Sequence, residues 1–418
     1  RIPVLKRIIM SDLAPLHDLL SEMVQAYSQK NQAPHIPTPA EIGTHLHPLL
    51  DRMCEEAEKR NASDIFISAG FPPAIKVGGT LTPMPHKALT GADTAAIAES
   101  TMNPDQLEAF NRDWEINYSV QSRSNTRYRV NAYHEQGRVG MVLRRVSQDI
   151  PEMKTLGLPE KLQELALAPR GLLILAGPTG SGKSTTMASM LNYRNQKLPG
   201  HIVTIEDPIE FIYKPCRSIF TQREIGIDTD NWKTAVQSAM RQAPDVVCIG
   251  EVRSEESMEY ALQLAQTGHL CVFTIHASTA SQTIERIINF YPEDRRQQVL
   301  MDLALNLVGI IGQRLTIKKN RQRTAVTDLL LNTPAMQDLI FKGELLEIRD
   351  LMARSGSNGM QTFDQNLFNL YAQGQIELSE ALRQAVSVND LRLRIQMHDE
   401  GNNTERLYDR ISDLNLMT

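Results

Sequence analysis

One short segment constrains the fold of this chain more than any other. It reads Gly177-Pro178-Thr179-Gly180-Ser181-Gly182-Lys183-Ser184, and Thr185 follows it. The segment matches the phosphate-binding pattern G-x-x-x-x-G-K-[ST], with a β-prone apolar run before it and a helix-prone stretch after it. Glycines let backbone N–H groups turn inward around phosphate oxygens, and the positive end of the following helix faces the same anion. The pattern therefore predicts a strand, a phosphate loop and a helix; a flexible glycine-rich turn is the alternative.

Two side chains at the end of this loop match the chemistry of a nucleoside triphosphate. Lys183 would place a compact positive charge on the β- and γ-phosphates, and Ser184 would offer its hydroxyl to Mg²⁺. We therefore expect ATP and Mg²⁺ as the cofactors of this chain.

A parallel sheet is predicted from Gly171 onward, because short apolar runs alternate there with helix-prone stretches. The runs are Leu172–Ala176, Ile202–Ile205, Val246–Ile249 and Leu270–Ile275. Acidic side chains follow the second and third of these runs, and they are Glu206, Asp207 and Glu210, then Glu251. Ligands bind beyond the carboxyl ends of such strands, so these carboxylates are candidates to orient water and to hold a metal shell. Each acidic segment taken alone could instead be a solvated loop.

Two histidines flank the last of these runs, His269 before it and His276 after it. They are either structural hydrogen-bonding residues or groups that sense the γ-phosphate and couple it to a neighbouring subunit. A metal role is not indicated, because the sequence suggests no third ligand.

Arginines gather in the β-prone runs of the N-terminal part, and they are Arg127, Arg129, Arg144 and Arg145. Arginines on strands are commonly solubilising side chains. The functional alternative is that some of them are arginine fingers, which stabilise the charge of a bound nucleotide during hydrolysis.

The chain of 418 residues is long enough for two or three domains. The predicted parts are an N-terminal amphipathic helix and linker (1–45), a small α+β domain with an antiparallel sheet (46–147), an interdomain linker (148–170), the nucleotide-binding domain (171–385) and a helical tail (386–418). From Arg286 onward the residue pattern favours mostly helix.

Composition narrows the class of protein. The formal net charge of -5 disfavours bulk nucleic-acid binding, which relies on clustered positive charge, so no nucleic-acid partner is expected. The four cysteines form no C-x-x-C pair, which argues against a zinc knuckle and a disulfide scaffold. No apolar run is long enough for a transmembrane helix and no signal-peptide pattern is present, so a cytoplasmic protein is expected.

Several motifs together identify a family. They are GPTGSGKST from Gly177, TIEDPIEF over Thr204–Phe211, CIGEVR over Cys248–Arg253, and TGHL with TIHA between Thr267 and Ala277. In order and spacing they resemble the secretion-superfamily ATPases and, within that group, the pilus retraction ATPases of the PilT and PilU types. The resemblance covers most of the chain and implies an α/β protein. Its expected parts are a PAS-like α+β N-terminal domain, a RecA-like P-loop core with a helical C-terminal region, and assembly as a hexameric ring.

The resemblance assigns roles to the phosphate loop and the first acidic segment. Lys183 and Ser184 fall on the phosphate-loop pair of the family. Glu210 falls on the catalytic glutamate of the acidic box, with Glu206 and Asp207 beside it near the nucleotide.

Further roles come from the same resemblance. Glu251 falls on the Walker B glutamate, which would support Mg²⁺ together with the phosphate-loop serine. His269 and His276 fall on the histidine box of the family. Arg129 and Arg144 match the N-terminal arginines that approach the nucleotide, although neighbouring arginines compete for both positions.

Within the family, Ile287–Arg296 and Val388–Arg394 resemble the PilU type more than the PilT type. PilT-type proteins carry Ala-Ile-Arg-Asn-Leu-Ile near the C-terminus, and Ala335–Ile340 has Met, Gln and Asp at the three central positions. The resemblance therefore implies an ATPase motor for type IV pilus retraction and twitching motility that is accessory to PilT.

The expected partners are further copies in a homo-hexamer, a PilT-like motor and an inner-membrane pilus platform protein, at the inner face of the bacterial inner membrane. One alternative is a nucleotide-gated adaptor that supports a PilT motor with hydrolysis secondary. A pilus-assembly or type II secretion ATPase is another, but such proteins commonly carry a four-cysteine zinc insertion that the cysteine spacing here does not supply. A DNA-translocating RecA-like motor is the third, and net acidity counts against it.

Overall fold

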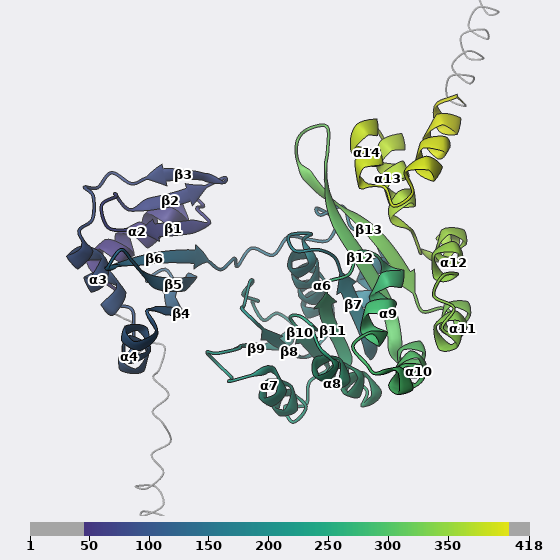
Figure 1. Cartoon of the computed structure of the whole chain (residues 1–418), viewed down its shortest axis with the longest axis horizontal. Coiled ribbons are helices and arrows are strands. Elements are labelled where there is room, and N and C mark those ends of the chain that lie inside the picture. Colours follow the sequence, from purple (N-terminus) through teal and green to yellow (C-terminus); the bar gives the residue numbers. More distant parts are fainter. Residues whose placement is uncertain (1–45, 401–418) are drawn as a thin grey trace, which may run out of the picture. The chain divides into compact units, whose positions relative to one another are not determined.

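The computed structural model describes residues 46–400, so the helix and linker predicted over 1–45 and the tail from 401 onward lie outside the described residues. The chain divides between Arg145 and Val146 into two compact units (Figure 1). In the described range, none of the helices combines the length and the apolar character that crossing a bilayer requires.

The first unit is a six-stranded antiparallel sheet with helices, in the strand order β3-β2-β1-β6-β5-β4. Its elements are α2 (Pro48–Lys59), β1 (Asp64–Ile67), β2 (Ala74–Val77), β3 (Thr80–Pro83), α3 (Gly91–Glu99), α4 (Pro104–Asp113), β4 (Glu115–Gln121), β5 (Arg127–Glu135) and β6 (Arg138–Arg145). Along β5 the buried residues Tyr128, Val130 and Ala132 alternate with half-buried polar ones, so one face of the sheet packs on the core. The predicted α+β character of this region is confirmed.

The second unit is built on a seven-stranded sheet in the order β13-β12-β7-β11-β10-β8-β9, parallel except for β13. Its strands are β7 (Gly171–Ala176), β8 (Gly200–Glu206), β9 (Ser218–Glu224), β10 (Val246–Ile249), β11 (Leu270–Ile275), β12 (Leu307–Ile317) and β13 (Arg323–Leu331). Every residue of β7 and β11 is buried, which requires cover on both faces of the sheet. The predicted parallel α/β core is confirmed.

Helices connect and cover these strands (Figure 1). They are α5 (Lys161–Ala166), α6 (Lys183–Lys197), α7 (Trp232–Ala239), α8 (Glu255–Gln266), α9 (Ala280–Ile288), α10 (Arg296–Asn306), α11 (Pro334–Lys342), α12 (Ile348–Arg354), α13 (Phe363–Ala372) and α14 (Leu378–Gln384), with short 3-10 helices at Glu293–Arg295 and Gly356–Asn358. Two of them, α8 and α13, begin at capping boxes formed at Ser254 and Thr362, which satisfy backbone N–H groups of the first turn.

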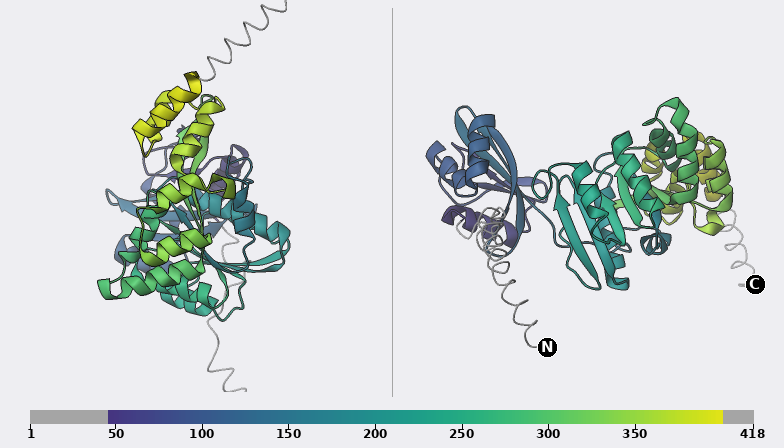
Figure 2. Two further views of the ribbon diagram at one scale, coloured as in Figure 1. Left: turned by 90° about the vertical axis from the view of Figure 1, so that its right-hand side faces the viewer. Right: turned by 90° about the horizontal axis from the view of Figure 1, so that it is seen from below.

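The prediction of mostly helix after Arg286 was wrong for the segment that forms β12 and β13. β12 adds to the sheet beside β7, and β13 returns antiparallel to it. A short apolar run reads alike as a buried strand or a buried helix, so periodicity did not separate the two. The later helices, α11 to α14 and residues 388–400, lie along one side of the second unit in Figure 1 and at one end of it in the right-hand view of Figure 2.

The segment predicted as an interdomain linker, 148–170, also differs from expectation. It contains α5, and Met153, Leu158, Leu162 and Leu165 are buried in the same core as the sheet of the second unit. Leu162 and Leu165 lie three residues apart on one helical face, so a single short turn buries both.

Candidate nucleotide site

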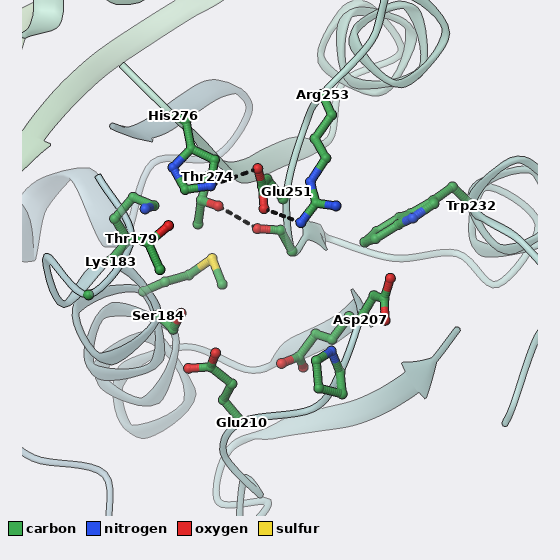
Figure 3. A pocket seen from close by; sticks show the side chains of 15 residues that line it. Thr179, Lys183, Ser184, Asp207, Glu210, Trp232, Glu251, Arg253, Thr274 and His276 are labelled. Atoms are coloured by element: carbon green, nitrogen blue, oxygen red, sulfur yellow. Dashed lines mark hydrogen bonds and ion pairs between the residues drawn. The ribbon is translucent and has the colours of Figure 1, made fainter. Parts of the chain in front are cut away.

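Four adjacent parallel strands, in the order β8-β10-β11-β7, end at one edge of the second sheet. The segments that follow them line a pocket of about 270 Å³ (Figure 3). Its lining residues are Thr179, Gly180, Lys183, Ser184, Met187, Glu206, Asp207, Pro208, Glu210, Trp232, Gly250, Glu251, Arg253, Thr274 and His276. Parallel strands thus gather the phosphate loop, both acidic segments and His276, which lie far apart in the sequence.

The phosphate loop connects β7 to α6 in a conformation that depends on glycine. Gly180 and Gly182 have φ values of +77° and +87°, in the left-handed region that L side chains rarely adopt. Gly182 is also the N-cap of α6 and offers that helix no side-chain cap. The first-turn N–H groups are therefore available to an anion, which the positive helix end favours.

Lys183 is buried and belongs to the loop itself. Its Nζ donates hydrogen bonds to the carbonyl oxygens of Gly177 at 2.8 Å and Pro178 at 3.0 Å. Burial lowers the pKa of the ammonium, and the nearby charges of Glu251 and Glu210 partly oppose that effect. An anionic ligand in the pocket would supply the missing negative charge.

Glu251 is held from two sides. Its Oε1 lies 3.0 Å from Nε2 of His276, and its Oε2 accepts a hydrogen bond from Arg253 at 2.7 Å. Burial raises the pKa of this carboxyl, but the Arg253 hydrogen bond and the charges of His276, Arg253 and Lys183 outweigh it, so the pKa lies below its ordinary value. Glu251 is therefore an ionised, oriented carboxylate.

His276 links this carboxylate to the phosphate loop. Its Nδ1 lies 3.2 Å from the carbonyl oxygen of Gly177, while its Nε2 faces Glu251. One imidazole thus contacts the loop and an acidic side chain at the same time, and Figure 3 shows its contact with Glu251. The ring therefore connects the loop to Glu251 by direct contacts on both sides.

The first acidic segment holds carboxylates in different environments. Glu206 is buried and accepts a hydrogen bond from Thr204 Oγ1 at 2.6 Å, whereas Asp207 and Glu210 are exposed. Burial raises the pKa of Glu206 to about 7, although hydrogen bonds from Thr204 and Gln222 partly oppose the rise. In Figure 3 the Glu210 carboxylate points toward the side of the pocket where the phosphate loop lies.

We expect Glu206→Gln to stabilise the protein above about pH 7 and not near pH 5. The folded state keeps the Glu206 proton up to a pKa of about 7, whereas the unfolded chain releases it near 4.5, so wild-type stability falls as the pH rises between these values. Glutamine carries no charge and can still accept from Thr204. Urea unfolding at pH 5 and pH 8 should show a gain on the order of 3 kcal/mol at pH 8 only.

Exposed Glu164 on α5 supplies the matched control, because Glu164→Gln removes the same charge at the surface. A gain of equal size at both pH values, or an equal gain in the control, would contradict a buried neutral carboxyl at position 206.

The structure does not bring every predicted site residue to the pocket. His269 precedes β11 and His276 follows it, so the two lie at opposite ends of one strand. The Nδ1 of His269 lies near the carbonyl oxygen of Leu264 and the hydroxyl of Thr267. Within one chain the two histidines do not share a site, and a catalytic role for His269 stays a prediction.

Arg129 and Arg144 lie in the first unit, on β5 and β6. They are direct cross-strand partners, so their side chains leave the same face of the sheet. Arg144 Nε is 2.8 Å from Asp64 Oδ1, a carboxyl that is largely buried. Both arginines belong to one charged row, and their approach to a nucleotide stays a prediction.

The residue-level assignments from sequence did not include six residues that line the pocket, which are Met187, Pro208, Trp232, Gly250, Arg253 and Thr274. Arg253 fixes Glu251, Thr274 donates to the carbonyl oxygen of Gly250 at 2.6 Å, and Trp232 lines the wall at the start of α7. Arg253 lies in the same short motif as Glu251, so the sequence could have indicated that it belongs to the site. Trp232 comes from a helix whose sequence carries no nucleotide-binding pattern.

The chain is similar to known proteins in both sequence and structure. A family model described as "Type II/IV secretion system protein" matches residues 41–334. The chain is 48% identical over 343 residues to the type IV pilus ATPase PilU of Pseudomonas aeruginosa, covering 82% of this chain and 90% of that protein. It is 36% identical over 332 residues to the pilus retraction ATPase PilT of the same bacterium, covering 78% and 95%. The crystal structure of the retraction motor PilT with bound ADP matches with a TM-score of 0.77 at 39% identity, covering 82% of this chain and 98% of that one.

Proposed function

This chain belongs to the type II/IV secretion system protein family, and we propose that it is an ATP-hydrolysing motor subunit of type IV pilus retraction, of the PilU kind. The observation that carries the proposal is the pocket itself. At one sheet edge it joins a complete phosphate loop to the carboxylates of Glu210 and Glu251. Such an arrangement suits phosphoryl transfer to water, because that reaction needs positioning and charge stabilisation more than covalent chemistry.

The residues present fit a nucleotide with Mg²⁺. The hydroxyl of Ser181, inside the loop, is buried without a hydrogen-bond partner among the described residues, and the first turn of α6 has no side-chain cap. Ser184 and Glu251 would hold the metal ion. No group of three or more His, Cys, Asp and Glu in residues 46–400 is arranged to bind a metal ion. When bound, Mg²⁺ would neutralise charge that develops on the phosphates.

Each side chain then has a distinct task. Lys183 binds the β- and γ-phosphates and offsets their charge. Glu210, exposed to the pocket, orients the attacking water and accepts its proton. Glu251, fixed by Arg253 and His276, supports the metal shell, while His276 transmits the state of the loop. Glu206 and Asp207 flank the nucleotide beside Glu210.

The partners and location of the motor are part of the proposal, and its relatives support them. A homo-hexamer, a PilT-like partner motor and a pilus platform protein of the inner membrane are the proposed partners, with the protein at the cytoplasmic side of that membrane. The relatives in support are the ATPases named PilU and PilT. Retraction force would come from nucleotide-dependent rearrangement of the subunits in the ring.

We expect the purified full chain to hydrolyse ATP, with Mg²⁺ required, in a particle of several subunits. The measurement is steady-state ATP turnover, alone and with a PilT-type protein, with the mass determined by light scattering. Turnover that appears alone, or rises when the partner is added, supports a motor. If the chain binds ATP and associates with the partner but neither hydrolyses ATP nor changes the partner's rate, the motor assignment is wrong and an adaptor takes its place.

A further inference from the structure

A buried glutamine outside the pocket lining contacts the phosphate loop. Gln313 lies on β12, the strand beside β7, and is 2% exposed. We propose that Gln313 is a positioning residue for nucleotide binding, which holds the phosphate loop in its binding shape. The proposal rests on the nucleotide-hydrolysing function proposed above, and it adds a residue that none of the sequence motifs contains.

The side-chain amide of Gln313 uses its donor and its acceptor on two different parts of the site. Its Nε2 donates to the carbonyl oxygen of Ser181 at 2.7 Å, and its Oε1 accepts from Thr186 Oγ1 at 2.7 Å. Ser181 belongs to the loop, and Thr186, itself 1% exposed, lies in the first turn of α6. One amide therefore fixes the loop and the helix relative to the sheet.

The hydrogen bond from Gln313 to the Ser181 carbonyl oxygen also orients the backbone N–H of Gly182. In a trans peptide the C=O and the following N–H point in opposite directions. Because the Ser181 carbonyl points at Gln313, the N–H of Gly182 in the same peptide points away from β12. Gly182 immediately precedes Lys183, so the bond fixes the peptide that orients the end of the loop.

Close packing keeps this arrangement from relaxing. A Cβ on Gly182 would lie 2.8 Å from Gln313 Nε2, and a Cβ on Gly177 would lie 2.5 Å from the backbone oxygen of Gln313. Gly177 does not have a positive φ, so nearness to β12 and to Ser181 is what requires glycine there. β12 thus holds the loop by backbone contact at one end and by the glutamine amide at the other.

The test is Gln313→Met, which keeps the length of the side chain but removes both hydrogen bonds. We expect the affinity for MgADP to fall about tenfold and kcat/KM for ATP about 10- to 100-fold. Affinity is measured by calorimetric titration on the full chain and turnover in the steady state. Thr327→Val is the matched control: Thr327 lies directly opposite Gln313 on β13, is 1% exposed, and accepts a hydrogen bond from Gln361 and not from the loop.

A purely structural role for Gln313 predicts something different. Gln313→Met and Thr327→Val would then lower the melting temperature by similar amounts. At temperatures below its unfolding transition, Gln313→Met would bind MgADP as tightly as wild type, and this result would overturn the proposal. Thr186→Val removes one of the two bonds from the other side and keeps the test open if Gln313→Met fails to fold. Thr186→Val should weaken MgADP binding by itself, and the double variant should bind MgADP as tightly as Gln313→Met does. If Gln313→Met cannot be measured, wild-type affinity in Thr186→Val overturns the proposal. If both variants can be measured, additive losses of affinity in the double variant overturn it.

Lys183→Ala separates this proposal from the function on which it rests. If Lys183→Ala binds MgADP as well as wild type, the site itself is misassigned and both proposals fall. If Lys183→Ala loses binding while Gln313→Met keeps it, only the positioning role is wrong.

Discussion

We expect Lys183→Ala to abolish measurable ATP turnover and to lower the affinity for MgADP by at least about a hundredfold, the largest effect of any single substitution. The ammonium of Lys183 is buried within the phosphate loop and lines the pocket. Hydrogen bonds to charged groups each contribute roughly 1.5–3 kcal/mol. The substitution would remove the bonds from Lys183 to the β- and γ-phosphates at the same time. Calorimetric titration with MgADP and steady-state ATP turnover measure the two losses separately.

Lys233→Ala is the matched control for this variant. Lys233 lies on α7 in the same unit, its side chain is 60% exposed, and its nearest carboxylate is 3.9 Å away. The control removes the same charge without touching the pocket, so turnover and affinity should stay at the wild-type level. Persistent wild-type turnover in Lys183→Ala would show that the hydrolysis comes from another site or from a contaminant.

Glu210→Gln should lower ATP turnover by roughly 10²–10⁴-fold while the affinity for MgADP stays within about threefold of wild type. Glutamine keeps the size and one acceptor oxygen of the side chain but cannot take a proton from water. Glu210 is exposed to the pocket and the phosphate loop does not depend on it, so nucleotide binding should survive. Single-turnover hydrolysis in the presence of Mg²⁺ reports the chemical step directly.

Glu251→Gln is the informative comparison for Glu210→Gln. Glu251 is tied to Arg253 and His276, so its amide variant loses ion pairs as well as charge. If Glu210→Gln hydrolyses ATP near the wild-type rate while Glu251→Gln is inactive, Glu251 and not Glu210 accepts the proton from water. If Glu210→Gln loses binding and hydrolysis equally, Glu210 has a structural role and no direct part in proton transfer.

Local sequence patterns predicted much of the fold. The phosphate loop was predictable because its glycines and Lys183 match a pattern whose chemistry is confined to a few adjacent residues. The runs that became β7, β8, β10 and β11 were predictable because a strand buried on both faces must be apolar at nearly every position. These signals lie within the sequence of each element, so no long-range information is needed to read them.

Other features depended on contacts between distant segments. The sequence determined which residues carry charge and which loop matches a phosphate-binding pattern. Only the tertiary structure decided that β12 lies beside β7 and brings Gln313 to the loop, and that His269 and His276 lie at opposite ends of β11. It also decided that Glu206 is buried while Glu210 is exposed, although the two are neighbours in one acidic segment. Burial, pairing and direction belong to the packing of whole elements, and residue spacing along the chain does not contain them.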